Sequence, residues 1–112
     1  MKTRCALIKL KPNALDRVTA WASTLKSRRQ EVTETLAKEG VVLESAFLAQ
    51  IGDDDYLVYL MRSGDFEAAR RAGASSTAAI DEFHRQFKID TWLERTELTP
   101  LIDFTYPDDG SE

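Results

Sequence analysis

Two β-rich runs separated by a short turn are the feature that most constrains the fold of this chain. Residues 41–51 and 56–62 are rich in β-branched, aromatic and other apolar side chains, and residues 52–55 (Gly-Asp-Asp-Asp) have the length and chemistry of a hairpin loop. We expect the runs to pair as antiparallel strands, with Ile51 opposite Tyr56. This hairpin is the clearest supersecondary unit that the sequence predicts.

The side chains of this hairpin alternate between two faces that differ in polarity. One face is uniformly apolar and comprises Phe47, Ala49, Tyr56, Val58 and Leu60. The other face comprises Val42, Glu44, Ala46, Leu48, Leu57, Tyr59 and Met61. Because only the second face carries a charge, we expect helices to cover the first face. The face with Glu44 and Tyr59 is then expected to meet solvent, a ligand or another sheet.

The segment before the hairpin predicts one strand followed by a long helix. Residues 3–10 are strand-like, and the proline two positions later ends the run because proline cannot donate to a strand ladder. Asn13 has the position of a helix N-cap, and apolar residues recur at steps of three and four over residues 14–39 until Gly40 stops the helix. Residues 27–30 (Ser-Arg-Arg-Gln) interrupt the apolar stripe, so we expect a bend there or a contact with a partner subunit.

The segment after the hairpin predicts an interrupted helix and a last strand. Residues 63–65 (Ser-Gly-Asp) cap a short helix, and the small residues at 72–76 interrupt it. The second helical stretch begins at Thr77 and places on one face Ile80, Phe83, His84 and Phe87. We expect the last strand over residues 97–106 and a flexible acidic tail over residues 107–112.

The order strand, helix, hairpin, helix, strand is that of the α+β, ferredoxin-like βαββαβ fold. Residues 1–106 are expected to form a single domain, with both helical segments on one face of a four-stranded antiparallel sheet. The other face is then bare, and large apolar residues on it would be an aggregation hazard. We therefore expect two copies to pack sheet against sheet as a homodimeric α/β barrel.

Composition excludes several classes of function. The 112 residues carry 15 basic and 19 acidic side chains, without the basic stripe that binds nucleic-acid phosphates. The apolar runs are far shorter than the roughly 20 residues of a membrane helix. No signal-peptide pattern precedes the first strand, so we expect a cytoplasmic protein with neither nucleic acid nor membrane as a partner. No Cys or His cluster has metal-ligand spacing, we expect no cofactor, and Cys5 is predicted to be a small buried side chain.

A further comparison rests on residues 8–12 (IKLKP), 44–45 (ES), 55–59 (DYLVY), 80–88 (IDEFHRQFK) and 91–92 (TW). Together these segments resemble a small bacterial family of unknown function within the dimeric α/β-barrel superfamily. The resemblance covers almost the whole chain and implies the dimeric fold. The superfamily is associated with sugar mutarotases, monooxygenases, haem-degrading enzymes, muconolactone-isomerase-like proteins and ligand-binding regulators, so it does not fix the function.

His84 and Glu44 are the strongest candidates for proton transfer. His84 is the single histidine, and its side chain titrates near neutral pH. The alternative is a structural histidine on the helix surface, hydrogen-bonded to Asp81 one turn earlier. A Glu44 carboxylate between two sheets must be paired, hydrated or shifted in pKa, and its structural alternative is an ion pair with Lys9.

Other side chains complete the predicted site. Tyr59 is the third catalytic candidate, because its hydroxyl can donate to a substrate oxygen. The predicted ligand-binding residues are Lys9, Arg29, Phe87 and Trp92. The aromatic residues among them could instead pack in the core. Arg29 could instead be a solvent-exposed residue on the surface of its helix. The acidic run at 53–55 does not predict calcium, because a distal bidentate glutamate is lacking.

Two classes of function remain open. The first is a cofactor-independent enzyme, such as an isomerase, mutarotase, cyclase or monooxygenase, with a cavity that both His84 and Glu44 reach. The second is a non-catalytic dimer that binds a metabolite or protein, with a filled interior and a closed Glu44–Lys9 pair. A weaker alternative is haem degradation, but the first strand lacks the asparagine expected of those enzymes.

Overall fold

The computed structural model describes residues 1–107, in which four strands and four helices follow the order β1 α1 α2 β2 β3 α3 α4 β4. The strands are β1 (Lys2–Leu10), β2 (Val41–Ile51), β3 (Asp54–Ser63) and β4 (Trp92–Glu97). The helices are α1 (Leu15–Ser27), α2 (Arg29–Glu39), α3 (Phe66–Ser75) and α4 (Ala79–Thr91). Within this part of the chain, no helix is both long enough and apolar enough to cross a bilayer.

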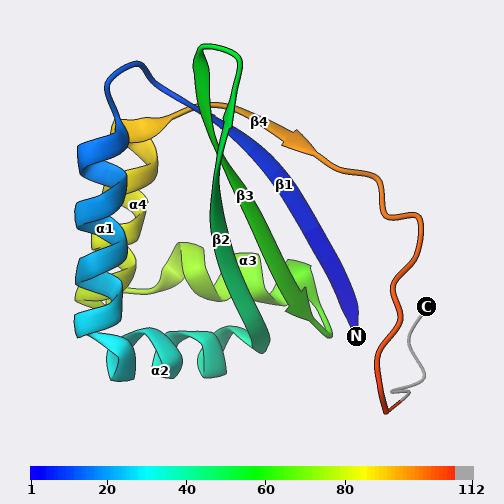
Figure 1. The fold of residues 1–112 in the computed structure, drawn as a ribbon. Coiled ribbons are helices and arrows are strands. Elements are labelled where there is room, and N and C mark those ends of the chain that lie inside the picture. Colours follow the sequence, from blue (N-terminus) through cyan, green and yellow to red (C-terminus); the bar gives the residue numbers. More distant parts are fainter. Residues whose placement is uncertain (108–112) are drawn as a thin grey trace.

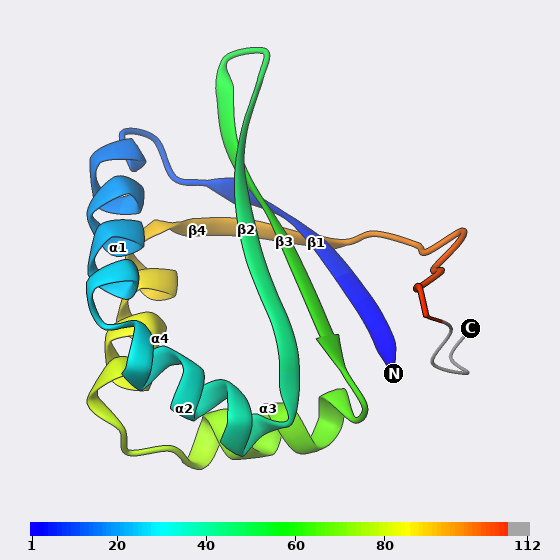
Figure 2. The same cartoon turned by 60° about the horizontal axis from the view of Figure 1, so that its bottom comes forward.

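The strands form one antiparallel sheet in the order β2-β3-β1-β4. All four helices lie to one side of it, with α1 beside α4 and α2 near α3 (Figures 1 and 2). This is the predicted α+β, ferredoxin-like arrangement, in which each of the two helical positions is divided into two helices. The sheet therefore has one covered face and one open face.

The long helical segment breaks at Arg28, within the four residues where the apolar stripe predicted a bend. Arg28 leaves helical geometry (φ −110°, ψ 36°), and its amide N–H still donates to the carbonyls of Thr24 and Leu25. Its guanidinium makes two hydrogen bonds to the Glu31 carboxylate, at 2.6 and 2.7 Å. Figure 1 shows α2 changing direction at the lower end of α1 and leading to the lower end of β2.

The hairpin is tighter than predicted. Ile51 lies opposite Asp54 instead of Tyr56, and the turn consists of Gly52, with φ +62°, and Asp53. Two-residue hairpin loops favour a positive φ because it matches the twist of the strands. The shift is two residues, so the side chains from Leu43 onward stay on their predicted faces. The prediction is wrong at the start of β2, where the register shifts between Val41 and Leu43: Val41 is buried, and Val42, which was predicted on the face of Glu44, is 58% exposed.

The assignment of those faces to helices and solvent was wrong. The helices cover the face that carries Leu57 and Tyr59, which are 2% and 7% exposed. On the other face Phe47 is 58% exposed. The prediction assumed that the face with a charged residue would be the uncovered one. Glu44 is instead half-buried on the covered face, where a cavity lies between the sheet and the helices.

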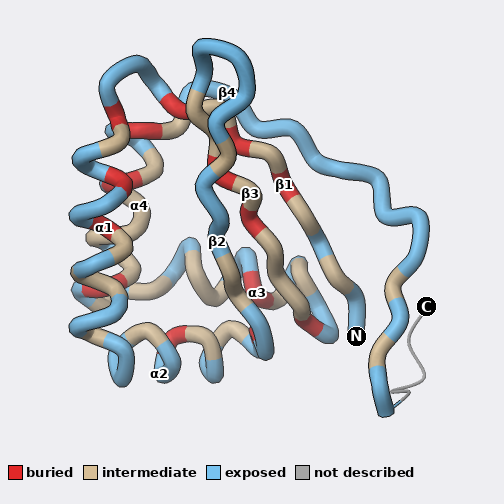
Figure 3. Tube along the Cα trace, in the orientation of Figure 1, coloured by how far each residue is buried: buried red, intermediate tan, exposed pale blue. Residues whose placement is uncertain are grey.

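The core lies between the covered face and the helices, as the buried segments in Figure 3 show. Trp21 of α1 stacks on Phe87 of α4 with ring centroids 4.4 Å apart and planes inclined by 4°. The buried residues of this cluster are Ala6, Ile8, Leu10, Ala14, Val18, Trp21, Leu57, Tyr59 and Phe87. Burial of these apolar surfaces fixes α1 and α4 against β1 and β3.

The helix ends match the sequence signals in two cases out of three. Gly40 ends α2 with φ +70°, and the Asp65 side chain caps α3 by accepting a hydrogen bond of 3.0 Å from the Ala68 amide. Asn13 is not the predicted N-cap. It adopts φ +62° in the turn before α1, a conformation that asparagine tolerates, and Ala14 occupies the cap position without a side-chain bond.

The final segment differs from its prediction. Helix α3 runs through most of the small-residue patch to Ser75, and β4 spans Trp92–Glu97 instead of residues 97–106. After β4, the Leu98 amide still donates to the Cys5 carbonyl at 2.9 Å, but Pro100 has no N–H to donate and the ladder ends. Residues 98–107 carry no strand, and positions 108–112 of the predicted acidic tail lie outside the described residues.

Candidate functional site

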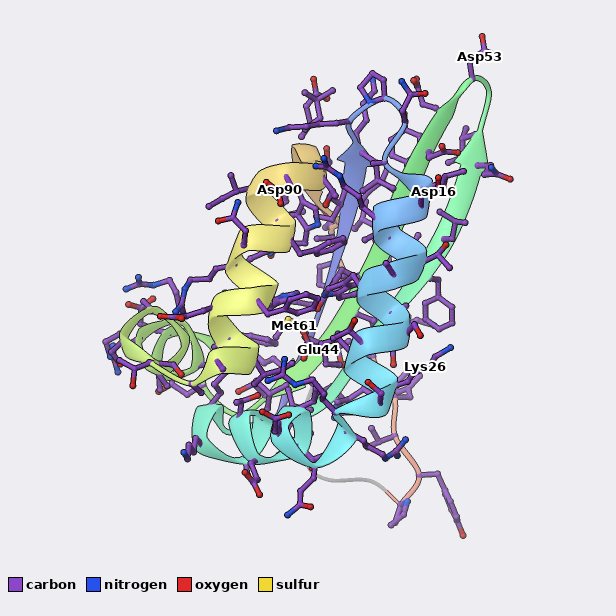
Figure 4. All side chains as sticks on the ribbon, turned by 90° about the vertical axis from the view of Figure 1, so that its left-hand side faces the viewer. Asp16, Lys26, Glu44, Asp53, Met61 and Asp90 are labelled. Atoms are coloured by element: carbon purple, nitrogen blue, oxygen red, sulfur yellow. The ribbon has the colours of Figure 1, made fainter. Side chains whose placement is uncertain are left out.

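A cavity of about 460 Å³ lies between the covered face of the sheet and the helices α2, α3 and α4. Its volume is within the range of small-molecule sites. Glu44 and Met61 are its labelled wall residues in Figure 4, where they lie in the interior between α4 and the α1–α2 bend. The charged and hydrogen-bonding residues of the wall are Arg4, Thr35, Glu39, Glu44, Tyr59, Arg70, Asp81, His84, Arg85, Lys88, Trp92 and Arg95.

Local geometry explains why these side chains meet at the cavity. On α4, wall residues recur at intervals of three and four positions, which places Asp81, His84, Arg85 and Lys88 on one helical face. On the sheet, Glu44 of β2 pairs with Met61 of β3, and strand alternation sets Tyr59 on the same face two residues earlier. The helix-borne histidine and the sheet-borne carboxylate therefore face each other across the cavity.

His84, Tyr59 and Glu44 form a hydrogen-bonded chain. The indole N–H of Trp21 donates to His84 Nδ1 at 3.2 Å, which leaves the proton of the neutral imidazole on Nε2. Nε2 lies 3.5 Å from the Tyr59 hydroxyl oxygen, the long end of hydrogen-bond distances. The Tyr59 hydroxyl in turn donates to Oε1 of Glu44.

Burial perturbs each of the three titrations. It lowers the pKa of His84 to about 4, with a further contribution from the charge of Lys88, so the imidazole is neutral at pH 7. It raises the pKa of Glu44, against the opposing hydrogen bond from Tyr59. Burial and then the charge of Glu44 raise the pKa of Tyr59 well above its usual value of 10.0. The Tyr59 hydroxyl therefore stays protonated and acts as a hydrogen-bond donor, and burial has made the Glu44 carboxylate more basic.

Two further titratable groups of the wall were not predicted as site residues. Burial, followed by the charges of Asp81 and Glu44, raises the pKa of Glu39 to about 7. Burial, followed by the charge of Arg95, lowers the pKa of Lys88, whose ammonium nitrogen lies 5.3 Å from the Trp92 ring centre. The spacing of Lys88 four positions after His84 was a helical signal that could have identified it.

Trp21 was also missed, although it stands three positions after Val18 in the apolar stripe of α1. Its bond to Nδ1 selects the tautomer of His84. The predicted hydrogen bond between His84 and Asp81 is wrong. Asp81 instead accepts a hydrogen bond from the hydroxyl of Ser76 in the turn before α4.

Of the four predicted ligand-binding residues, only Trp92 is among the residues that line the cavity. Trp92 lines the cavity, and its indole N–H is buried without a hydrogen-bond partner in residues 1–107. Phe87 is 5% exposed and belongs to the core beside the cavity. Arg29 is exposed on α2 and does not line the cavity.

Lys9 lies on the open face, where its ammonium group is 3.6 Å from the Asp54 carboxylate. The predicted ion pair between Lys9 and Glu44 is therefore wrong, because strand alternation puts the two residues on opposite faces of the sheet. Cys5 is on the same open face and is only partly buried. In the part of the chain that the structure describes, no His, Cys, Asp and Glu cluster could hold a metal ion.

A model for a family of unknown function, DUF6176, matches residues 1–108. The match spans nearly the whole chain, so the chain belongs to this family. No curated protein matches the chain.

Proposed function

We propose that this member of the DUF6176 family is a cytoplasmic, cofactor-independent isomerase that moves a proton on a small molecule bound in the cavity. Glu44 acts as the general base through its second carboxylate oxygen, and the raised pKa makes it a better acceptor near neutral pH. The neutral imidazole of His84 presents its Nε2–H to the oxygen on which negative charge develops. While Glu44 holds the proton, the Tyr59 hydroxyl can donate a hydrogen bond to the same oxygen. Glu44 then returns the proton to a neighbouring atom of the substrate, which completes the isomerisation and regenerates the carboxylate.

The hydrogen-bonded chain from His84 through Tyr59 to Glu44, at the wall of a 460 Å³ cavity, carries this proposal. A filled interior and a closed pair between Glu44 and Lys9 would have favoured a non-catalytic role. Neither condition is met, because Lys9 is on the open face and a cavity adjoins Glu44. A carboxylate and a neutral imidazole with displaced pKa values are a usual pairing of base and hydrogen-bond donor.

Solvent-hydrogen exchange tests the proposed chemistry even though the product is not identified. The protein is incubated in D₂O with a mixture of small oxo acids, hydroxy acids and aldehydes, and each compound is followed by mass spectrometry. We expect one class to gain deuterium with the wild type and to lose that gain with Glu44→Gln and with Tyr59→Phe. Glu34→Gln, which replaces an exposed carboxylate on α2, is the matched control and should behave as wild type. Exchange that survives both cavity substitutions contradicts the proposal.

We also propose that a second copy of the chain covers the open face of the sheet. Phe47 is 58% exposed there and Leu98, just after β4, is 41% exposed, which is unfavourable for a monomer in water. Sheet-to-sheet packing would bury the open face and leave the cavity, on the opposite face, unobstructed. Phe47→Glu should shift the mass measured by light scattering from dimer to monomer. A wild-type monomer at micromolar concentration would contradict this arrangement.

A further inference from the structure

Lys88 is a half-buried cation that forms no ion pair with a carboxylate of the described residues. It lines the cavity one turn beyond His84, and its ammonium group lies over the Trp92 ring. Glu44 and Glu39 raise its pKa through their charges, but neither forms an ion pair with it in residues 1–107. A charge removed from water without a partner is costly, and an anion bound in the cavity would offset that cost.

The other cations of the wall are already engaged. The Arg85 guanidinium donates to the carbonyl oxygens of Gly73 and Ser76, at 2.9 and 3.0 Å, and so joins the end of α3 to α4. The remaining arginines pair at the surface, Arg4 and Arg95 with Glu97, and Arg70 with Glu67. Lys88 is therefore the cation of the described wall that is available to a ligand.

The acidic residues of the wall limit the charge of that ligand. Glu39, Glu44 and Asp81 lie close enough for the charges of Asp81 and Glu44 to raise the pKa of Glu39. A second negative charge on a ligand would meet these carboxylates, and the described wall offers no second free cation to bind it. The apolar part of the wall, which includes Leu25, Met61, Ile80 and Trp92, fits an uncharged body.

We infer that the ligand is a small monocarboxylic acid whose carboxylate binds Lys88 while its apolar body fills the cavity. Four residues on a helix correspond to a rise of roughly 6 Å, so the carbon beside His84 and Glu44 lies a few bonds from the carboxylate. This inference rests on the proposed function and names the chemical class of its substrate. Lys88 is a binding residue in this scheme and takes no part in the proton transfer.

Four matched probes test it by calorimetry and by amide chemical shifts: benzoate, benzamide, benzylamine and phenyl phosphate. We expect saturable binding of benzoate at millimolar concentration, and weaker binding of the other three. Lys88→Met should weaken benzoate binding about tenfold, the effect of losing one charged hydrogen bond. Lys88→Arg should restore most of that loss, since it keeps the charge. Lys26→Met, at the surface of α1 away from the cavity (Figure 4), should change nothing.

Several results would overturn the inference. Benzamide, benzylamine or phenyl phosphate binding as tightly as benzoate would show that a single negative charge is not what the cavity selects. Equal benzoate affinity in Lys88→Met and wild type would remove Lys88 from the site, and so would the absence of any saturable benzoate binding.

The proposed function fails separately from this inference. If benzoate binds through Lys88 but no compound exchanges hydrogen in a Glu44-dependent way, the ligand class stands and the isomerase proposal falls. If exchange depends on Glu44 and Tyr59 but occurs on a neutral compound and survives Lys88→Met, the isomerase proposal stands and the ligand class falls.

Discussion

Replacing Glu39 by glutamine should make the protein more stable at pH 8 than the wild type, by more than any difference at pH 4. The pKa of Glu39 is raised from 4.5 to about 7 in the folded chain, because its carboxyl is partly buried beside Asp81 and Glu44. Between these two values the folded state holds a proton that the unfolded state has released. The wild-type free energy of unfolding therefore falls as the pH rises through this window.

The size of the effect follows from the gap between the two pKa values. A displacement from 4.5 to about 7 corresponds to about 3 kcal/mol at most. The Glu39 side chain is only partly buried, so water screens its charge, and we expect about 1–2 kcal/mol. Glutamine has nearly the same shape but no charge, so its variant should lack this pH-dependent loss.

His84 makes a contribution of opposite sign in an overlapping pH window. Its pKa falls from 6.5 to about 4 on folding, so between these values the unfolded state binds the extra proton and stability rises with pH. The two effects partly cancel in the wild type between pH 4.5 and 6.5. Glu39→Gln should therefore steepen the rise of stability with pH, and His84→Asn should leave a net fall.

Urea unfolding followed by tryptophan fluorescence, at half-unit steps from pH 4 to 8 and one protein concentration, measures these curves. Glu34→Gln, an exposed carboxylate of the same helix, is the control and should follow the wild-type curve. If Glu39→Gln has the same pH dependence as the wild type, the carboxyl of Glu39 is solvated and the electrostatic account of the cavity is refuted.

Three further substitutions test local contacts by urea unfolding at pH 7. Trp21→Phe keeps the aromatic stacking but leaves the buried Nδ1 of His84 without a donor, and should cost about 1–3 kcal/mol; no loss would mean that this bond is not made. Asp65→Ala removes the N-cap of α3 and should cost about 1 kcal/mol, whereas a neutral result would mean that water replaces the cap. Gly40→Ala should cost about 1–2 kcal/mol because φ is +70°, and Gly64→Ala, with an ordinary φ and open space around it, should cost less.

The elements were predictable because their signals are local. The turn residues after Ile51, the arginine at position 29 in the apolar stripe and the glycine at position 40 each act within a few residues. The two-residue error in the hairpin register preserved the faces, since side chains alternate with a period of two.

The placement of the site depended on long-range information and was predicted only in part. The sequence identified His84, Glu44 and Tyr59 as candidates, and the structure brings these three together. The sequence alone could not show which face of the sheet the helices cover. A half-buried glutamate that is hydrogen-bonded to a tyrosine has the same sequence pattern as an exposed glutamate. The sequence also could not show which residues of β1 lie on the same face of the sheet as Glu44 of β2. The predicted pair of Lys9 with Glu44 was wrong for this reason, because the two side chains lie on opposite faces.

The bend at Arg28 connects the local sequence signals with the placement of the site, because it is a local feature that shapes the cavity. Leu25 lines the cavity from the end of α1, and Thr35 and Glu39 line it from α2. A straight helix of the same length would carry the α2 residues past the end of the sheet, where they could not face α4. With the bend, α2 contributes Thr35 and Glu39 to the wall of the cavity and places the Glu39 carboxylate near Asp81 in the first turn of α4. The interruption of the apolar stripe is therefore a determinant of the site as well as of the fold.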